Sequence, residues 1–202
     1  MLGATVKPYY QNHVAGLLFL LLVIAFFGME IIQFFRQRAW RKNAIRVATP
    51  TFWVGAVVWT IVATVMLHGG SRIAPRAGMG DGVVVFVVGM ILFAAGAVLR
   101  WAFFWALGQY FTFTVNVSSD QDVVTKGPYS VVRHPGYAGG LLAMTGIGVI
   151  YANWVGLAGF VLPCLVIIIW RIQIEEAALF RTAGPAYRRY AAHHKRLVPL
   201  VW

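Results

Sequence analysis

The sequence is poor in charged residues, in acids and above all in cysteine. Only 11% of its 202 residues are charged, whereas 60% are hydrophobic, which excludes an ordinary soluble domain. The single cysteine, Cys164, excludes an intramolecular disulfide and a cysteine-based metal site. Six acidic residues in the whole chain leave little material for a carboxylate-rich metal centre, so we expect no metal. The composition therefore indicates a membrane protein.

The sequence also carries a strong excess of positive charge. Seventeen Lys and Arg residues against six acids give a net charge of +11, which on a soluble protein would suggest a nucleic-acid partner. The long apolar runs leave too little polar surface for such a partner, so we expect no nucleic acid to bind. The basic residues are better interpreted as signals of membrane topology.

Apolar segments are the dominant feature of the chain. A helix crosses the hydrocarbon core of a membrane with about 20 apolar residues, and five segments are candidates: 14–35, 52–67, 82–107, 137–151 and 154–170. The last two form a hairpin around Ala152-Asn153. The fourth is short, so we expect it to begin near His134, with Pro135 in its first turn. Its glycines Gly139, Gly140, Gly146 and Gly148 most simply allow close helix packing.

The distribution of the basic residues predicts the orientation. Thirteen of the seventeen lie after the first span, in residues 108–135 or in the tail after residue 170, whereas only Lys7, Arg72 and Arg76 lie on the other side. The positive-inside rule then places the N-terminus outside and the C-terminus in the cytoplasm. We expect a single, multi-pass integral membrane domain over residues 1–202. Its two N-terminal spans, in 1–81, would pack substrate or lipid, and residues 82–202 would form the functional core.

Polar residues gather in two cytoplasmic stretches, 109–137 and 171–202, which flank the terminal hairpin. The hairpin topology brings both to its open end. In the first stretch, Arg133 and His134 lie between Tyr129 and Tyr137 and could hold a ligand with carboxylate, ribose and adenine parts. An equally good interpretation is that Arg133 reaches lipid headgroups, His134 caps the span and the tyrosines form an interfacial aromatic belt.

The second stretch continues the fifth helix past the membrane surface. Arg171 and Glu175 are four residues apart and therefore share a helix face. Such a pair usually has no function, but Glu175 and Glu176 lie together at the membrane boundary, where a cationic ligand is a reasonable partner. Gly184 and Pro185 are expected to end the helix. The basic and aromatic segment after them, 187–196, would by default be an interfacial helix attracted to anionic lipid.

Two polar residues lie within predicted spans. Arg100 lies near the cytoplasmic end of the third span, and we expect its side chain to extend toward the membrane surface. Glu30 lies near the end of the first span and would pair with Arg36 or make a polar contact between helices.

With these residues in view, the sequence resembles the isoprenylcysteine carboxyl methyltransferases and their bacterial relatives. The resemblance covers about the C-terminal half, and both of its parts occur in order around one helical hairpin. The matching residues are Leu107, Gly108, Val124, Thr125, Lys126, Gly127, Pro128, Tyr129, Val132, Arg133, His134, Pro135, Tyr137, Arg171, Glu175, Glu176, Leu179, Gly184, Tyr187, Tyr190, Arg196 and Pro199.

The resemblance implies five transmembrane helices and a cytoplasmic site for S-adenosylmethionine, formed by the loop, the terminal hairpin and the helical tail. Its cofactor-binding residues correspond to Gln121, Asp122, Val123, Val124, Tyr129, His134, Pro135, Tyr137 and Glu175. Arg171 corresponds to the catalytic arginine that holds the methyl acceptor. The chain departs from the family pattern at Gly136, where a larger residue is common, and at Pro185-Ala186, where the family often has two acids.

The resemblance implies methyl transfer to a membrane-associated acceptor, with the carboxylate of an isoprenylcysteine-like molecule as the leading candidate. A carboxylate needs no general base, and only His134, His193 and His194 are candidate bases. Transfer to a thiol or to a phospholipid amine is an alternative. So is an NADPH-dependent membrane reductase, although Gly136, Gly139 and Gly140 fit the His-Pro-x-Tyr element of those enzymes poorly. A non-catalytic membrane protein would leave the polar residues unexplained.

Overall fold

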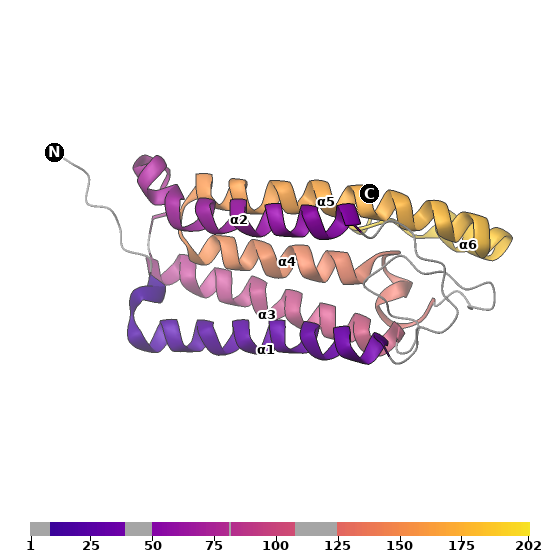
Figure 1. Cartoon of the computed structure of the whole chain (residues 1–202). Coiled ribbons are helices and arrows are strands. Elements are labelled where there is room, and N and C mark those ends of the chain that lie inside the picture. Colours follow the sequence, from indigo (N-terminus) through magenta and orange to yellow (C-terminus); the bar gives the residue numbers. More distant parts are fainter. Residues whose placement is uncertain (1–8, 39–49, 81, 108–124) are drawn as a thin grey trace.

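The computed structural model describes residues 9–38, 50–80, 82–107 and 125–202, and the chain is helical there apart from short connections (Figure 1). The elements in chain order are η1 (Tyr9–Gln11), α1 (His13–Arg38), α2 (Pro50–Ile73), η2 (Pro75–Ala77), α3 (Gly82–Leu107), η4 (Gly127–Ser130), α4 (Pro135–Ile150), α5 (Trp154–Thr182) and α6 (Gly184–His193). Each of the five predicted apolar segments lies in one of the helices α1 to α5, except that the fourth extends one residue, Tyr151, past the end of α4.

Three of these helices are long and apolar enough to cross a membrane by themselves. The qualifying segments are His13–Gln33 in α1, Gly82–Ala106 in α3 and Trp154–Thr182 in α5, and shorter apolar segments occur in α2 and α4. Large apolar side chains such as Leu17, Ile24 and Ile31 are exposed on α1, as expected for a surface in contact with lipid. The prediction of an all-α integral membrane protein is thus confirmed, whereas the number of five crossings stays a prediction.

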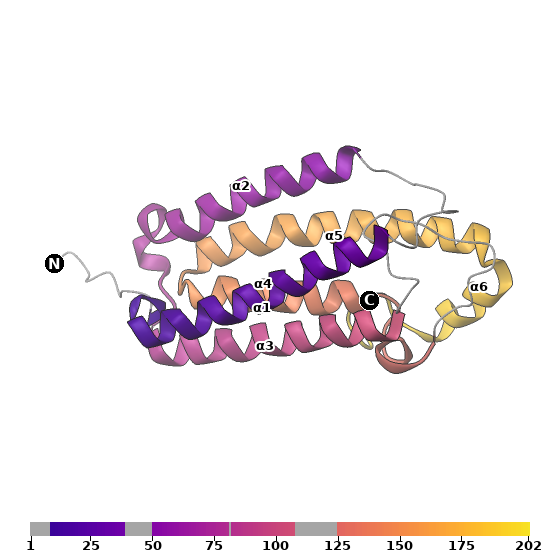
Figure 2. The same ribbon diagram turned by 60° about the horizontal axis from the view of Figure 1, so that its bottom comes forward.

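The helices pack side by side around the pair formed by α3 and α4. α1 lies against α3, α5 lies against α4, and α2 packs on α5 (Figures 1 and 2). The centre contains the fully buried ring of Phe93, which makes edge contacts with Phe26 and Phe19 at centroid distances of 5.6 Å and 6.2 Å. These aromatic contacts join α1 to the central pair.

Glycines allow α3 and α4 to approach closely. A Cβ atom added at Gly139 would lie 2.7 Å from the backbone nitrogen of Arg100 and 2.9 Å from the carbonyl oxygen of Gly96. Gly146 meets the backbone of α3 in the same way, and Gly148 faces Leu157 of α5, whereas a Cβ at Gly140 would meet nothing within 4 Å. The predicted packing role is therefore confirmed for Gly139, Gly146 and Gly148 and is wrong for Gly140.

Asn153 fixes the turn of the hairpin at one end of the bundle. Its side-chain oxygen accepts a hydrogen bond from the backbone nitrogen of Gly156 at 3.0 Å, which caps α5, and its amide nitrogen donates to the carbonyl of Ala74 at 3.0 Å. The turn between α4 and α5 is thereby tied to the connection that follows α2. The described polar residues of the predicted site lie at the opposite end of the hairpin, where α4 begins.

The structure contradicts the expectation for Arg100, and for Glu30 it supports the polar contact between helices instead of the pair with Arg36. The guanidinium of Arg100 on α3 donates to both carboxylate oxygens of Glu30 on α1, at 2.7 Å and 3.0 Å. Arg100 therefore points into the bundle instead of toward the membrane surface, and Glu30 pairs with it instead of with Arg36. Facing helices bring the two charges together although 70 residues separate them in the sequence.

Candidate active site

The described parts of the two polar stretches, 125–137 and 171–202, meet at the end of the bundle where α4 begins and α5 extends beyond it toward α6 (Figure 1). Gly127 starts η4 with a φ of +63°, a left-handed conformation that favours glycine. Pro135 lies within the first two residues of α4, as predicted, where its missing N–H costs no hydrogen bond. α5 continues to Thr182 and so carries Arg171, Glu175 and Glu176 past the start of α4.

The hydroxyl of Tyr137 joins the two residues singled out on α5. Arg171 donates from Nε to this hydroxyl at 2.7 Å, and the hydroxyl donates to Oε2 of Glu175 at 2.9 Å. We call these three residues the Tyr137 bridge. Arg171 and Glu175 share a face of α5, as their spacing predicts, and α4 inserts a phenol between them. The bridge places a cation and an anion beside one hydroxyl.

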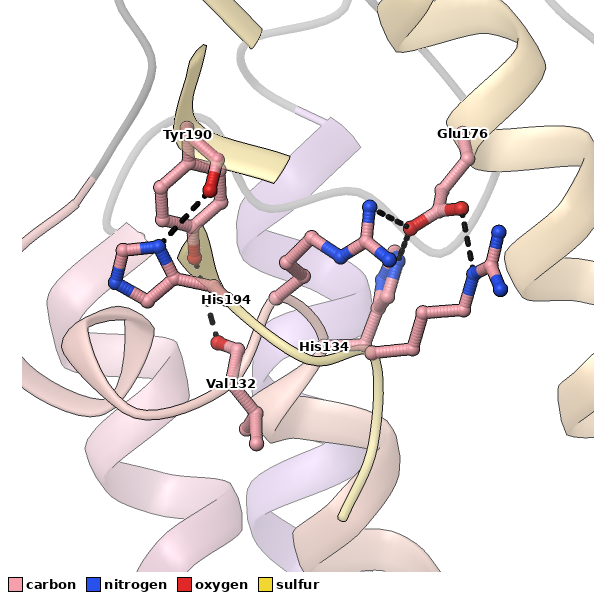
Figure 3. A network of polar contacts seen from close by, with 7 residues as sticks. Val132, His134, Glu176, Tyr190 and His194 are labelled. Atoms are coloured by element: carbon pink, nitrogen blue, oxygen red, sulfur yellow. Dashed lines mark hydrogen bonds and ion pairs between the residues drawn. The ribbon is translucent and has the colours of Figure 1, made fainter. Parts of the chain in front are cut away.

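A second network surrounds the adjacent carboxylate. Glu176, only 3% exposed, receives Arg133 Nη1 and His134 Nε2 on one oxygen at 3.0 Å and 3.3 Å, and Arg196 Nε on the other at 2.8 Å. Figure 3 shows His134 facing Glu176, with these contacts dashed. We call these four residues the Glu176 cluster. A buried carboxylate is stable only where charges and hydrogen bonds compensate for lost water, and here three cationic or imidazole side chains do so.

The last residues of the chain run beside the segment that leads into α4. The backbone nitrogen of Arg133 donates to the carbonyl of Lys195 at 2.8 Å, and that of His134 donates to the carbonyl of Arg196 at 2.9 Å. Tyr190 of α6 adds a hydrogen bond from its hydroxyl to the carbonyl of Tyr129 at 2.7 Å. The tail after α5 therefore folds back and holds the segment from η4 to α4 in place.

Three buried tyrosines line this end of the molecule. Tyr129, Tyr187 and Tyr190 pack together with Phe180, Leu179 and Phe103. Burial raises the pKa of Tyr129 well above its ordinary value, and the nearby carboxylate of Glu175 raises it further. Burial raises the pKa of Tyr190 to about 12, and burial and the carboxylate of Glu176 raise the pKa of Tyr187. All three are neutral hydrogen-bonding groups at physiological pH.

Two buried polar atoms of this end make no hydrogen bond within the described part of the chain. They are the hydroxyl of Tyr187 and Nε of Arg133. The pKa of Tyr187 responds to the charges of Arg133, Glu175 and Glu176, so the two atoms lie in the same polar region. Buried tyrosine hydroxyls normally have a partner, and a bound polar molecule would supply one.

The structure brings most of the predicted site residues together. Tyr137, Arg171 and Glu175 are in direct contact, Tyr129 lies near enough for its pKa to respond to Glu175, and Pro135 is buried between His134 and Tyr137. His134 is buried against Glu176 and is part of the Glu176 cluster, not of the Tyr137 bridge. The predicted residues Gln121, Asp122, Val123 and Val124 lie outside the described residues. No cluster of metal ligands occurs in the ranges that the structure describes.

The sequence-based site omitted Glu176 and two of its cationic partners. Glu176 follows Glu175 directly, and residues one apart on a helix point in directions that differ by about 100°. Two adjacent carboxylates on α5 therefore could not both face Tyr137, and the second needed partners elsewhere. Arg133 and Arg196 lie in the two polar stretches as basic residues, but no spacing in the sequence connects them to Glu176.

Comparison with known families finds similarity to membrane methyltransferases. A family model described as phospholipid methyltransferase matches residues 84–183, which contain all but the first two residues of α3 and the whole of α4 and α5. The chain is 30% identical over 115 residues to protein-S-isoprenylcysteine O-methyltransferase A of Arabidopsis thaliana, and the match covers 56% of this chain and 58% of the plant protein. It is 35% identical over 115 residues to protein-S-isoprenylcysteine O-methyltransferase of Xenopus laevis, covering 56% and 38% of the two chains.

The chain spans less than two thirds of the length of these relatives. Its fold is similar to that of a solved structure, the eukaryotic intramembrane Ras methyltransferase ICMT (isoprenylcysteine carboxyl methyltransferase). The TM-score is 0.59 and the identity 24%, with 78% of this chain and 55% of the other covered. The family model and the relatives match the part of the chain that carries the two motifs on either side of the hairpin, so this part is similar to phospholipid methyltransferases and to isoprenylcysteine O-methyltransferases.

Proposed function

We propose that this protein transfers a methyl group from S-adenosylmethionine to the carboxylate of an isoprenylcysteine-like molecule at the membrane. The Tyr137 bridge carries this proposal, because it places Arg171 and Glu175 on either side of one hydroxyl. A methyl-transfer site must bind an anionic acceptor and a cationic donor within reach of each other. Arg171 suits the first task and Glu175 the second.

The residues present fit S-adenosylmethionine. The carboxylate of Glu175 would face its positive charge, the rings of Tyr129 and Tyr187 would contact its apolar parts, and the buried Tyr187 hydroxyl and Arg133 Nε offer donors without partners. When bound, the cofactor supplies a methyl group on a sulfonium sulfur, which keeps the bonding electrons as a neutral thioether while an acceptor oxygen forms the new bond to carbon. His134, Pro135 and the predicted residues 121–124 would complete this site.

The acceptor is proposed to be a carboxylate because the described part of the site offers Arg171 but no histidine that is free to act as a base. His134 is engaged with Glu176, and the Nδ1 atoms of His193 and His194 contact carbonyl oxygens within α6. A thiol or an amine would have to lose a proton, whereas a carboxylate attacks as it is. The negative charge of the carboxylate and the positive charge of the sulfonium neutralise each other in such a transfer, so a site that excludes water favours it.

The membrane setting is consistent with a lipophilic acceptor. Arg171 lies in the same helix as the apolar segment of α5, so an apolar chain could remain in the lipid while its carboxylate reaches the guanidinium. We propose that the N-terminus is outside, that the site faces the cytoplasm, and that residues 1–81 contribute packing for lipid or substrate to the core of 82–202. Arg100, in the core, already contacts the N-terminal part through Glu30.

The test is a methyl-transfer assay on purified protein with radiolabelled S-adenosylmethionine and a small S-farnesylated cysteine as acceptor. The expected product is a methyl ester, which releases its label as methanol in base. Arg171→Ala should abolish transfer, while the matched control Arg181→Ala, an exposed arginine at the end of the same helix, should retain it. A wild-type protein that binds the cofactor and forms only base-stable product would overturn the carboxylate assignment.

A phospholipid amine is the second candidate acceptor, favoured by the description of the matching family model. A label that is transferred to vesicles of phosphatidylethanolamine and stays on the headgroup amine after base treatment would support it over the first. Binding of NADPH without binding of S-adenosylmethionine would favour a reductase over both.

A further inference from the structure

The ion pair between Glu30 and Arg100 reaches the proposed active site through a third contact. Arg100 Nη1 donates to the backbone carbonyl oxygen of Gly136 at 2.9 Å, while the same guanidinium holds Glu30 through Nε and Nη2. Gly136 is the residue between Pro135 and Tyr137. One planar group therefore links α1, α3 and the first turn of α4.

We propose that Glu30 and Arg100 are positioning residues that set the first turn of α4 and thereby the place of the Tyr137 hydroxyl. This inference rests on the proposed function for its catalytic consequence. It assigns a role to α1, whose residues lie outside the matched range 84–183. The three residues Glu30, Arg100 and Gly136 are called the α1 clamp below.

The burial of the α1 clamp shows that it is a specific contact. The side chains of Arg100 and Glu30 are 14% and 17% exposed, within helices apolar enough to span a membrane. Charged residues in such segments are costly unless paired, and they commonly mark functional sites. The guanidinium also lies 4.9 Å from the ring centre of Phe104, a cation–π distance that shields it further from lipid.

Gly136 is held from two sides. A Cβ atom at this position would lie 2.7 Å from the ring of Phe103, so only glycine lets the α4 start lie this close to α3. Arg100 then fixes the carbonyl of the same residue. Gly136, which departs from the family pattern, is thus the residue of α4 that Arg100 binds, and Tyr137 follows it directly.

A guanidinium is needed because a lysine could not make all three contacts. Arg presents several donors in one plane and in fixed directions, whereas the Lys ammonium is a compact charge on a flexible stem. Arg100→Lys should keep the ion pair with Glu30 and lose the simultaneous contact with Gly136. The substitution therefore separates the stability of the pair from the positioning of α4.

Two readouts, methyl transfer and hydrogen exchange at the start of α4, test the clamp. In Arg100→Lys, the temperature of unfolding should fall by no more than about 2 to 4 °C, as expected for the loss of one hydrogen bond, while methyl transfer to the small S-farnesylated cysteine falls about 10- to 100-fold through a displaced Tyr137. The backbone amides of Tyr137 and Ala138, which donate to the His134 carbonyl, should exchange hydrogen about tenfold faster, as expected for the loss of about one net hydrogen bond. The exchange measurement requires neither cofactor nor acceptor.

Two further variants complete the experiment. The double substitution Glu30→Gln with Arg100→Gln removes both charges and leaves no unpaired ion, so it should fold and show the same faster exchange at Tyr137 and Ala138. The control Trp59→Phe removes another hydrogen bond between apolar helices, from Trp59 Nε1 to the carbonyl of Phe160 at 3.1 Å, and should change neither readout.

The outcomes distinguish this inference from the proposed function. Wild-type exchange at the start of α4 in Arg100→Lys would overturn the clamp, and so would acceleration spread evenly over all helices, which indicates a general loss of stability. Faster exchange confined to the first turn of α4 supports it. If that result is found in a protein that transfers no methyl group, the clamp stands and the proposed function fails.

Discussion

Glu175 and Glu176 are neighbours in the chain, but their carboxylates belong to different networks. Glu175 accepts the hydroxyl of Tyr137 at 2.9 Å, whereas Glu176 turns toward Arg133 and His134 and reaches Arg196 on its other oxygen. The rotation of about 100° between successive helical residues separates them. Glu175 is therefore proposed to take part in methyl transfer, whereas Glu176 stabilises the packing of the C-terminal tail against the start of α4.

Glu176→Gln should destabilise the protein. The substitution leaves Arg133 and Arg196 near a group without charge, and removing one partner of a buried ion pair costs about 3 kcal/mol or more. The free energy of unfolding in detergent should fall by about this amount, and protease should cut the tail after α6 sooner, since the tail is held by these contacts. Unchanged stability would show that the Glu176 cluster does not hold the tail.

Glu175→Gln should leave stability unchanged and weaken cofactor binding. Because Gln can still accept the Tyr137 hydroxyl, unfolding should be unchanged, but the negative charge that faces the cofactor is gone. A hydrogen bond or contact to a charged group is worth about 1.5 to 3 kcal/mol, so affinity for S-adenosylmethionine should fall about tenfold or more, as measured by calorimetric titration. Equal affinity in wild type and variant would remove Glu175 from the cofactor site.

The sequence predicts the helices well because apolar runs report lipid-facing surface directly. It also predicts that Arg171, Glu175 and Tyr137 come together, since a hairpin must return its ends to the same side. The ion pair of Glu30 with Arg100 escapes prediction because nothing local indicates which face of α1 meets α3. The sequence offered Arg36 as a nearer partner for Glu30, and helix packing placed Arg100 there instead.

The tail of the chain was predicted only in part. Its basic and aromatic residues suggested an interfacial helix, and α6 does expose Arg188 and Arg189. The backbone hydrogen bonds from Arg133 and His134 to residues 195–196 have no sequence signal, because any residue can make them. Only tertiary contacts determine that residues 195–196 pair with the segment before α4.

Tyr190→Phe should alter the response of stability to alkaline pH. Burial raises the pKa of Tyr190 from its ordinary value of 10.0 to about 12, so the folded protein holds this proton more tightly than the unfolded chain. Its contribution is complete below pH 10 and is lost as the pH rises through about 12. Chemical unfolding at several pH values should show a shallower decline above pH 10 in the variant.

At neutral pH the same variant should be less stable by about 1 kcal/mol, because the hydrogen bond from Tyr190 to the carbonyl of Tyr129 is lost. Parallel alkaline curves for wild type and variant would show that this phenol titrates alike in both states.

Gly139→Ala and Gly140→Ala form a matched pair that tests the contact between α3 and α4. The new methyl group at Gly139 would lie 2.7 Å from a backbone atom of α3, whereas at Gly140 it would meet nothing within 4 Å. Backbone cannot move aside as a side chain can, so Gly139→Ala should cost about 1 to 3 kcal/mol of stability. Gly140→Ala should be neutral or stabilise α4 by up to about 1 kcal/mol, through helix propensity. Equal unfolding free energies would mean that the helices lie farther apart, and the path from Arg100 to Gly136 would then be longer than a hydrogen bond.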